Sequence, residues 1–130
     1  MVSSEAQEIV KRIVSRTHES SDLGRMIELL CADTDSGILG ELLDADDELL
    51  VADGAYLLAE VGAAGRSMLP RALGLVCHPR QDVRYWAMSS IISCAERPIA
   101  RKAIIDAGFL SDPWELTREA AARFLKKTEP

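Results

Sequence analysis

Apolar residues recur at helical spacing in three stretches of this chain, and the stretches themselves recur at a nearly constant interval. The clearest stretch runs from Asp82 to Glu96, and the side of its helix that would face a core carries Val83, Ala87, Ser90, Ile91 and Cys94. Related stretches begin at Val51, 32 residues before Val83, and at Leu116, 33 residues after Val83. A period of about 20–50 residues is typical of arrays in which each pair of helices packs on the next. The pattern therefore predicts an all-α array.

The start of the central stretch points to a family of repeats. Asp82-Val83-Arg84 is followed by Ala87 and, four residues later, by Ile91, which resembles the second helix of a HEAT repeat. The short period is similar to that of the PBS-lyase-type HEAT-like repeats of bacterial proteins, and the resemblance covers about residues 45–125. It implies a right-handed α-solenoid of HEAT-like helix pairs with about seven helices.

The outer two stretches can be aligned on the central one. The buried stripe would then pass through two sets of equivalent positions, Val51, Val83 and Leu116 in the first and Ala55, Ala87 and Ala120 in the second. Ala52 and Thr117 occupy the places aligned with Arg84, so only the central repeat has the Asp-Val-Arg start.

We expect one domain over residues 1–130, with capping helices in 1–44, recognisable repeats in 45–125 and a tail in 126–130. Capping residues, glycines and prolines between the apolar stretches mark the ends of the helices. In the first half of the chain the expected helices run from Ser3 or Ser4 to about His18, from the residue after Asp22 to the 32–37 turn, over Ile38 to Leu43, and from a cap at Asp46 or Asp47 to Gly62. In the second half they run over Arg66 to Cys77, from the cap Asp82 to Glu96, over Ile99 to Leu110, and onward from a cap at Asp112 followed by Pro113.

Composition narrows the classes of partner. The chain has 15 basic and 21 acidic residues, a formal net charge of -6, which opposes binding to the phosphate backbone of a nucleic acid. A basic protein is the favoured partner, because opposite charges speed the encounter. We expect no nucleic acid and no membrane as partners, since no apolar run approaches the ~18 residues of a membrane span.

The cysteines predict a reducing compartment. Cys31, Cys77 and Cys94 are odd in number and have no C-x-x-C spacing, and no signal peptide precedes the first expected helix. We expect a soluble, cytoplasmic protein in which all three cysteines are small buried hydrophobic residues.

Catalysis, a metal and a cofactor are not expected. His18 and His78 are the only imidazoles, and their spacing to the cysteines matches no zinc pattern. HEAT-like di-iron hydroxylases take their ligands from repeated His-Glu pairs, whereas His18-Glu19 is the only such pair here. The chain also lacks a G-x-S-x-G elbow, a glycine-rich phosphate loop and an H-E-x-x-H helix.

The helix faces opposite the buried stripe are the candidate partner-binding surface. They carry Tyr85, Ser89, Ile92 and Glu96 on the central helix, Asp53, Leu57 and Glu60 on the preceding one, and Arg118 on the next. The candidate partner-binding residues, which include acids of the preceding turn, are Asp46, Asp47, Asp53, Tyr56, Glu60, Tyr85, Ser89, Glu96 and Arg118. The alternative is a solvated helix face with no partner.

Two further features of this surface can be predicted. The acids between Asp44 and Glu60 have no Lys or Arg near them in the sequence, which predicts a negative patch. Trp86 and Trp114 are expected to pack at the joints between neighbouring helices rather than to contact a ligand.

These observations favour a non-catalytic protein-binding module. Small acidic HEAT-like proteins of this kind resemble bacterial immunity proteins, which neutralise a toxin by covering it. Two alternatives stay open: a lyase-like or enzyme-accessory HEAT-repeat subunit, related to tetrapyrrole binding or protein modification, and an adaptor that works as an oligomer. Neither the identity of the partner nor the oligomeric state follows from the sequence.

Overall fold

The computed structural model describes residues 4–32 and 37–129, and its regular structure there is entirely helical. The predicted all-α class is confirmed, and the described residues contain eight α-helices, close to the expected number of about seven. The elements are α1 (Ser4–Val14), α2 (Ser20–Ala32), α3 (Gly37–Leu43), α4 (Glu48–Val61), the 3-10 helix η1 (Gly62–Met68), α5 (Leu69–Gly74), α6 (Gln81–Cys94), α7 (Arg97–Asp106), the 3-10 helix η2 (Phe109–Ser111) and α8 (Glu115–Lys127). No helix in these ranges is both long enough and apolar enough to cross a membrane.

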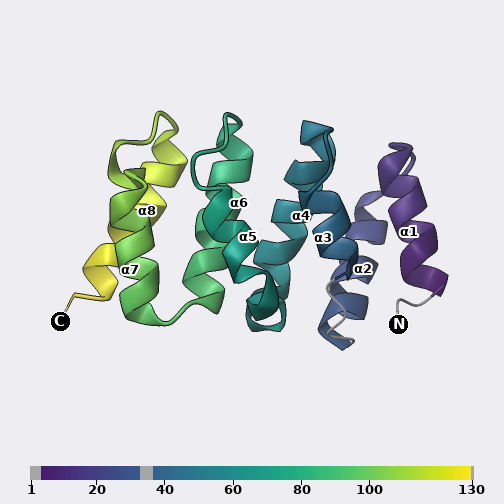
Figure 1. Cartoon of the computed structure of the whole chain (residues 1–130), viewed down its shortest axis with the longest axis horizontal. Coiled ribbons are helices and arrows are strands. Elements are labelled where there is room, and N and C mark those ends of the chain that lie inside the picture. Colours follow the sequence, from purple (N-terminus) through teal and green to yellow (C-terminus); the bar gives the residue numbers. More distant parts are fainter. Residues whose placement is uncertain (1–3, 33–36, 130) are drawn as a thin grey trace.

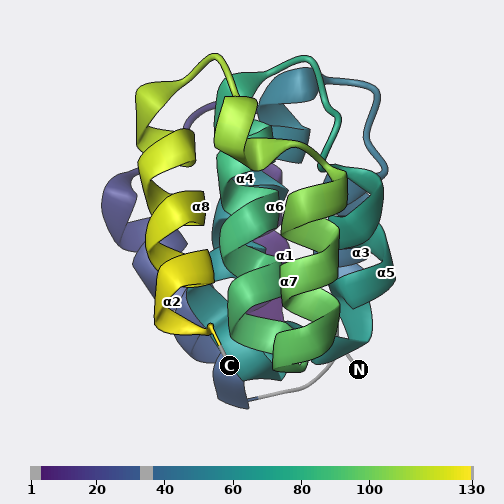
Figure 2. The same ribbon diagram turned by 90° about the vertical axis from the view of Figure 1, so that its left-hand side faces the viewer.

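The helices follow one another along the long axis of the molecule in chain order, from α1 at one end to α7 and α8 at the other (Figure 1). They form two layers, with α1, α3, α5 and α7 in front of α2, α4, α6 and α8 in this view. Seen along the axis, α2 and α8 stand out beyond α4 and α6 on the side of the second layer (Figure 2). The α3–α4, α5–α6 and α7–α8 turns lie along one edge, and the α6–α7 turn lies on the opposite edge (Figure 1).

The predicted stripe of the central helix is confirmed. The side chains that α6 buries include all five predicted ones, Val83, Ala87, Ser90, Ile91 and Cys94. Two of these carry polar atoms that have partners: the Ser90 hydroxyl donates to the Trp86 carbonyl within α6 at 2.9 Å, and Cys94 Sγ contacts the carbonyl oxygen of Gly62, 32 residues away, at 2.9 Å. Burial therefore does not leave these atoms without partners.

The predicted helix caps are partly right. Asp47 caps α4, because its side chain accepts from the Leu49 N–H at 2.8 Å. Asp82 is not the cap of α6: the extended residue before the helix is Arg80, and Asp82 lies in the first turn, where its carboxylate pairs with Arg80 at 2.8 Å. Asp112 is not the cap of α8 either, since Trp114 holds that place.

The alignment of the third stretch is wrong by one residue. Leu116, placed in the buried stripe by the sequence, is 43% exposed. The buried positions of α8 are instead Thr117 and Ala121, which lie 34 residues after Val83 and Ala87. A threonine breaks the apolar pattern, so an alignment on hydrophobicity selects its neighbour.

Several helix boundaries differ from those predicted, each for a local reason. The first helix ends at Val14, because Arg16 has a positive φ of 60°. The segment from Arg66 to Cys77 is not one helix: it is covered in part by η1 and by α5, whose first turn holds Pro70. The helix predicted to reach Leu110 ends at Asp106, before Gly108 at φ 74°. The predicted cap Ser3 lies outside the described residues.

Two of the three cysteines are not where the sequence places them. Cys94 is buried as expected, whereas Cys31 and Cys77 are exposed, and all three are free thiols. Cys31 lies next to the buried Leu30, so the stripe of α2 is narrower than predicted. Burial raises the pKa of the Cys94 thiol.

Gly54 allows α3 and α4 to approach closely. A Cβ at this position would lie 2.9 Å from Leu42 Cβ and 3.3 Å from the backbone nitrogen of Leu43. We expect Gly54→Ala to lower the free energy of unfolding by about 1–3 kcal/mol, because overpacking outweighs the better helix propensity of alanine. Gly24 of α2 is the matched control, since a Cβ there has no neighbour within 4 Å. Thermal melts should show Gly24→Ala unchanged or more stable, and a comparable gain for Gly54→Ala would contradict the close contact.

Candidate functional site

All four Tyr and Trp residues of the chain form one row across three neighbouring elements. Tyr56 of α4 meets Trp86 of α6 edge to face, with ring centroids 5.0 Å apart. Tyr85 stacks on Trp86 at 5.0 Å and meets Trp114, the residue before α8, edge to face at 5.5 Å. Each side chain is neither fully buried nor fully exposed. The aromatic row confirms that both tryptophans pack at joints between helices, while the other half of that expectation, that they do not contact a ligand, stays a prediction.

The outer end of the aromatic row is held by a buried ion pair. Arg84 Nε lies 2.8 Å from Asp112 Oδ2, and the two side chains are 15% and 5% exposed. Arg84 Nη1 also donates to the carbonyl oxygens of His78 and Pro79 at 2.9 and 3.0 Å. Asp112 Oδ1 in turn accepts from the Trp114 N–H at 2.9 Å. The pair therefore ties the α5–α6 turn to the α7–α8 turn and fixes the backbone that carries Trp114.

The pKa of Asp112 lies below its ordinary value although the carboxylate is buried. Burial alone would raise this pKa, because it penalises the charged form. The hydrogen bonds from Arg84 and from the Trp114 N–H outweigh burial, together with the positive charges of Arg84 and Arg118. Arg118 also donates to the backbone carbonyl of Asp112 at 2.6 Å. Asp112 is therefore a charged, fully partnered group that holds structure at neutral pH.

The acidic stretch from Asp44 to Glu60 is less negative in the fold than predicted. The sequence places no Lys or Arg close to these acids along the chain, yet two of the carboxylates meet an arginine from elsewhere in the fold. Asp44 pairs with Arg71, and Asp53 pairs with Arg16 in the α1–α2 turn. These partners lie 27 and 37 residues away in the sequence, so a search of neighbouring residues misses them.

Four carboxylates of this stretch have no ion pair among residues 4–32 and 37–129. They are exposed and comprise Asp46, Asp47, Glu48 and Glu60. We define the candidate surface as the aromatic row together with these four acids, of which Asp46, Asp47 and Glu48 lie at the start of α4 and Glu60 near its end. Tyr56 and Glu60 lie four residues apart on α4, which places an aromatic ring and a free carboxylate on one helix face.

The remaining predicted site residues are less well grouped. Ser89 is half-buried on α6, and Arg118 is occupied by its bond to Asp112. Glu96 is exposed in the α6–α7 turn, at the opposite edge of the molecule from Asp46 (Figure 1). Leu57, predicted to face outward with Asp53 and Glu60, is completely buried. The outward face of α4 is therefore narrower than a helical wheel suggests.

The structural role of the Arg84–Asp112 ion pair does not follow from the sequence. Arg84 stood out as part of the HEAT-like start, and Asp112 as a helix cap, yet no local pattern links residues 28 positions apart. Within the described ranges no three His, Cys, Asp or Glu side chains are grouped closely enough to hold a metal ion. Comparison of the chain with protein-family models, with curated proteins and with solved structures finds no match.

Proposed function

We propose that this chain is a non-catalytic protein-binding module that covers a basic partner, in the manner of an immunity or inhibitor protein that neutralises a toxin. The observation that carries the proposal is the aromatic row, in which Tyr and Trp rings from three elements pack together and stay partly exposed. Tyr and Trp side chains are frequent anchors of protein interfaces. Because these rings already support one another, they lose little conformational freedom on binding.

The exposed acids of the candidate surface indicate that the partner is basic. Asp46, Asp47, Glu48 and Glu60 are exposed and have no ion pair among the described residues. Exposed charges of one sign mainly raise the association rate and orient the partner, while apolar contacts supply most of the affinity. A partner rich in Lys and Arg fits this division of roles.

The proposed architecture is a right-handed solenoid of HEAT-like helix pairs. Support comes from the two layers of helices in chain order and from the equivalent burial of Val51 with Val83 and of Ala55 with Ala87. The proposed compartment is the cytoplasm. Support comes from the exposed free thiols of Cys31 and Cys77, because a reducing compartment keeps such thiols from forming disulfides.

The proposal predicts a charge-dependent association. A partner captured on the immobilised protein and identified by mass spectrometry should be basic, and its association rate should fall as salt is raised. Asp46→Asn combined with Glu60→Gln should slow association several-fold at low salt and flatten the salt dependence, with the melting temperature unchanged. Asp53 is left intact, because its substitution would also remove an ion pair with Arg16 within the chain.

Glu41→Gln is the control for charge alone, because Glu41 is an exposed acid on α3, in the other layer. It should leave the association rate within about twofold of wild type. Growth arrest by the partner expressed alone, relieved when this chain is co-expressed, would support the immunity role. Association that is indifferent both to salt and to Tyr85→Ala would remove the basis of the proposal.

A further inference from the structure

The last quarter of the chain differs in charge from the rest. Residues 1–96 contain eight Lys or Arg against sixteen Asp or Glu, whereas residues 97–130 contain seven against five. Two of those five acids are already paired, Asp106 with Lys102 and Asp112 with Arg84. The end of the molecule formed by α7 and α8 is therefore basic within an acidic chain (Figure 1).

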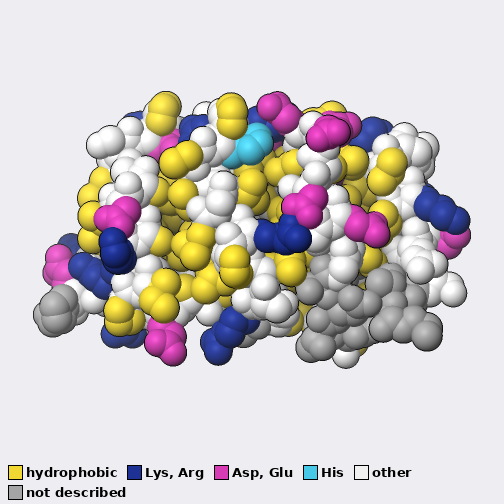
Figure 3. Space-filling model, viewed as in Figure 1, with side chains coloured by type: hydrophobic (Ala, Val, Ile, Leu, Met, Phe, Trp, Pro, Cys, Tyr) yellow, Lys and Arg dark blue, Asp and Glu magenta, His cyan; other side chains and the backbone are white. Residues whose placement is uncertain are grey.

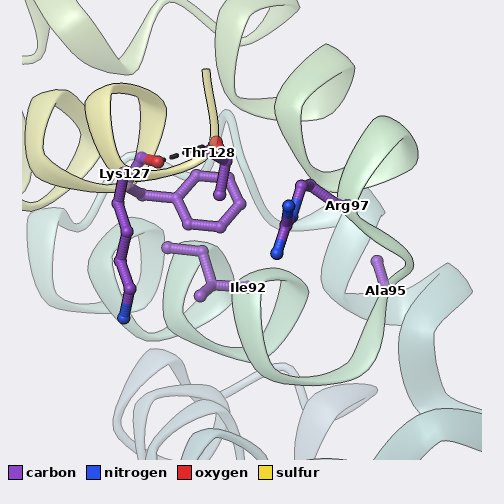
Figure 4. Close-up of a pocket in the computed structure, with 6 residues that line it drawn as sticks. Ile92, Ala95, Arg97, Lys127 and Thr128 are labelled. Atoms are coloured by element: carbon purple, nitrogen blue, oxygen red, sulfur yellow. Dashed lines mark hydrogen bonds between the residues drawn. The ribbon is translucent and has the colours of Figure 1, made fainter. Parts of the chain in front are cut away.

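A hollow of about 350 Å³ opens at this basic end, among the C-terminal ends of α6 and α8 and the start of α7. Its apolar lining consists of Ile92, Ala95 and Phe124. Figure 4 shows the side chains of Arg97 and Lys127 on opposite sides of Ile92. The hollow thus has an apolar floor between two cations.

Two adjoining hollows extend this one along the surface. The first, of about 280 Å³, shares Phe124 and Lys127 with it and adds Arg123. The second, of about 370 Å³, shares Arg97 and adds Arg101 and one acid, Glu129. The face viewed in Figure 3 also shows hydrophobic side chains close to basic ones near this end of the molecule. We call the three hollows together the basic groove.

Some polar groups of the basic groove are already satisfied within the chain. The Thr128 hydroxyl donates to the Phe124 carbonyl at 2.8 Å (Figure 4). Arg101 Nη1 donates to Thr128 Oγ1 at 2.6 Å and to the Leu125 carbonyl at 2.7 Å. Arg101 therefore has a structural role.

Three cations of the basic groove remain available to a ligand. Arg97, Arg123 and Lys127 make no ion pair or side-chain hydrogen bond with any residue of 4–32 and 37–129. A carboxylate ligand would meet these cations without first having to displace an internal partner. Bonds between such ionised groups are stronger than those between neutral ones.

We propose that the basic groove binds an acidic peptide segment of a partner protein, in which an apolar side chain sits between two carboxylates. The apolar side chain would cover Ile92 and Phe124, and the carboxylates would pair with Arg97 and Lys127. An extended nucleic acid fits less well, because the neighbouring surface of residues 1–96 is strongly acidic and would repel a polyanion. Tyr85 and Ile92 lie seven residues apart on one face of α6, so the groove continues that face beyond the aromatic row.

The proposal can be tested with a fluorescein-labelled Glu-Glu-Leu-Glu-Glu peptide and the full chain. Fluorescence anisotropy at low ionic strength should show saturable binding. Arg97→Gln and Lys127→Gln should each weaken binding about fivefold, and the two together more than tenfold. A peptide with serine in place of leucine should also bind at least about fivefold more weakly, because it cannot use the apolar floor.

Arg66→Gln is the matched control, because Arg66 is exposed, has no ion pair with a described residue and lies outside the basic groove. It should leave the peptide affinity within about twofold. No saturable binding, or equal affinity for the serine peptide, would overturn the proposal. Tighter binding of a single-stranded oligothymidine at the same residues would overturn it in favour of a nucleic acid. Self-association in sedimentation that Arg97→Gln abolishes, and that the peptide does not inhibit, would overturn it in favour of a second copy.

Discussion

Val83→Asp should lower the free energy of unfolding by roughly 3–5 kcal/mol, because it places a carboxylate without a partner in the core. Val83 has no exposed surface and lies in the same core cluster as Val51 and Ile91. Burial would raise the pKa of the new carboxyl group, which would therefore be largely protonated and neutral at low pH. The loss of stability should accordingly be larger at pH 8 than at pH 4. Thermal and urea melts followed by circular dichroism measure both effects.

Leu116→Asp is the matched control for this substitution. Sequence alignment makes Leu116 equivalent to Val83, whereas the fold leaves Leu116 43% exposed. We expect Leu116→Asp to change the stability by no more than about 0.5 kcal/mol. Equal losses of stability in the two variants would support the alignment of Leu116 with Val83 and contradict the register of α8.

Arg84→Met should also cost roughly 3–5 kcal/mol, because Asp112 would remain buried with its main charge partner removed. The methionine fills much of the same space, so the loss reports the charge rather than a cavity. Arg80→Met is the control: Arg80 and Asp82 also form an ion pair, yet their side chains are 34% and 35% exposed. That pair should contribute no more than about 1 kcal/mol.

The deficit of Arg84→Met should depend on pH in a defined direction. In the wild type the pKa of Asp112 is lowered, so its contribution to stability is present above the ordinary carboxyl pKa of 3.8 and is lost as pH falls through the lower folded value. In the variant, burial is less opposed and the same carboxyl destabilises the fold at neutral pH. The gap in melting temperature should therefore be widest near pH 7 and close as pH falls below 4. A gap that does not vary with pH would show that Arg84 acts through packing alone.

The sequence predicts α6 well because its information is local. Val83, Ala87 and Ile91 share one helix face, and the period of the helix alone brings them together. The cap at Asp47 is predicted from equally local information, because a capping side chain binds an N–H within its own helix turn. Each of these features is decided within a few residues of its own position.

Long-range ion pairs are not predictable in this way. Arg16 reaches Asp53 of α4 from the α1–α2 turn, and Arg84 of α6 reaches Asp112 in the α7–α8 turn. Which of many surface carboxylates meets a guanidinium depends on how the helices pack, and the periodicity of a single helix does not contain that information. The acidic patch was therefore predicted to be more negative than it is.

The candidate surface could be predicted from the sequence only in part. Tyr56 and Tyr85 were predicted to lie on it, and Trp86 and Trp114 were predicted to pack at the joints, each from its position on a helix face. The four rings form one row only because α4, α6 and the start of α8 lie side by side. The array predicts that neighbourhood, whereas the ring contacts follow only from the fold.

The error in α8 has a physical cause as well. Thr117 is completely buried, and its hydroxyl oxygen has no hydrogen-bond partner among the described residues. A buried hydroxyl without a partner is unfavourable, so hydrophobicity argues for Leu116 at the interior position. Packing of Ala121 with Met88 of α6, Ile104 of α7 and Phe109 of η2 decides the register instead.

Because the helices follow chain order along the long axis, a position in the sequence is also a position along the molecule (Figure 1). The negative excess of residues 1–96 and the positive excess of residues 97–130 are therefore separated in space, which gives the protein a permanent dipole moment along that axis. Within about 8 Å, the screening length of physiological salt, the field of such a dipole turns an approaching protein whose own charges are unevenly distributed. A partner with one basic and one acidic region would be turned to lie lengthwise along the molecule, in one of the two possible directions.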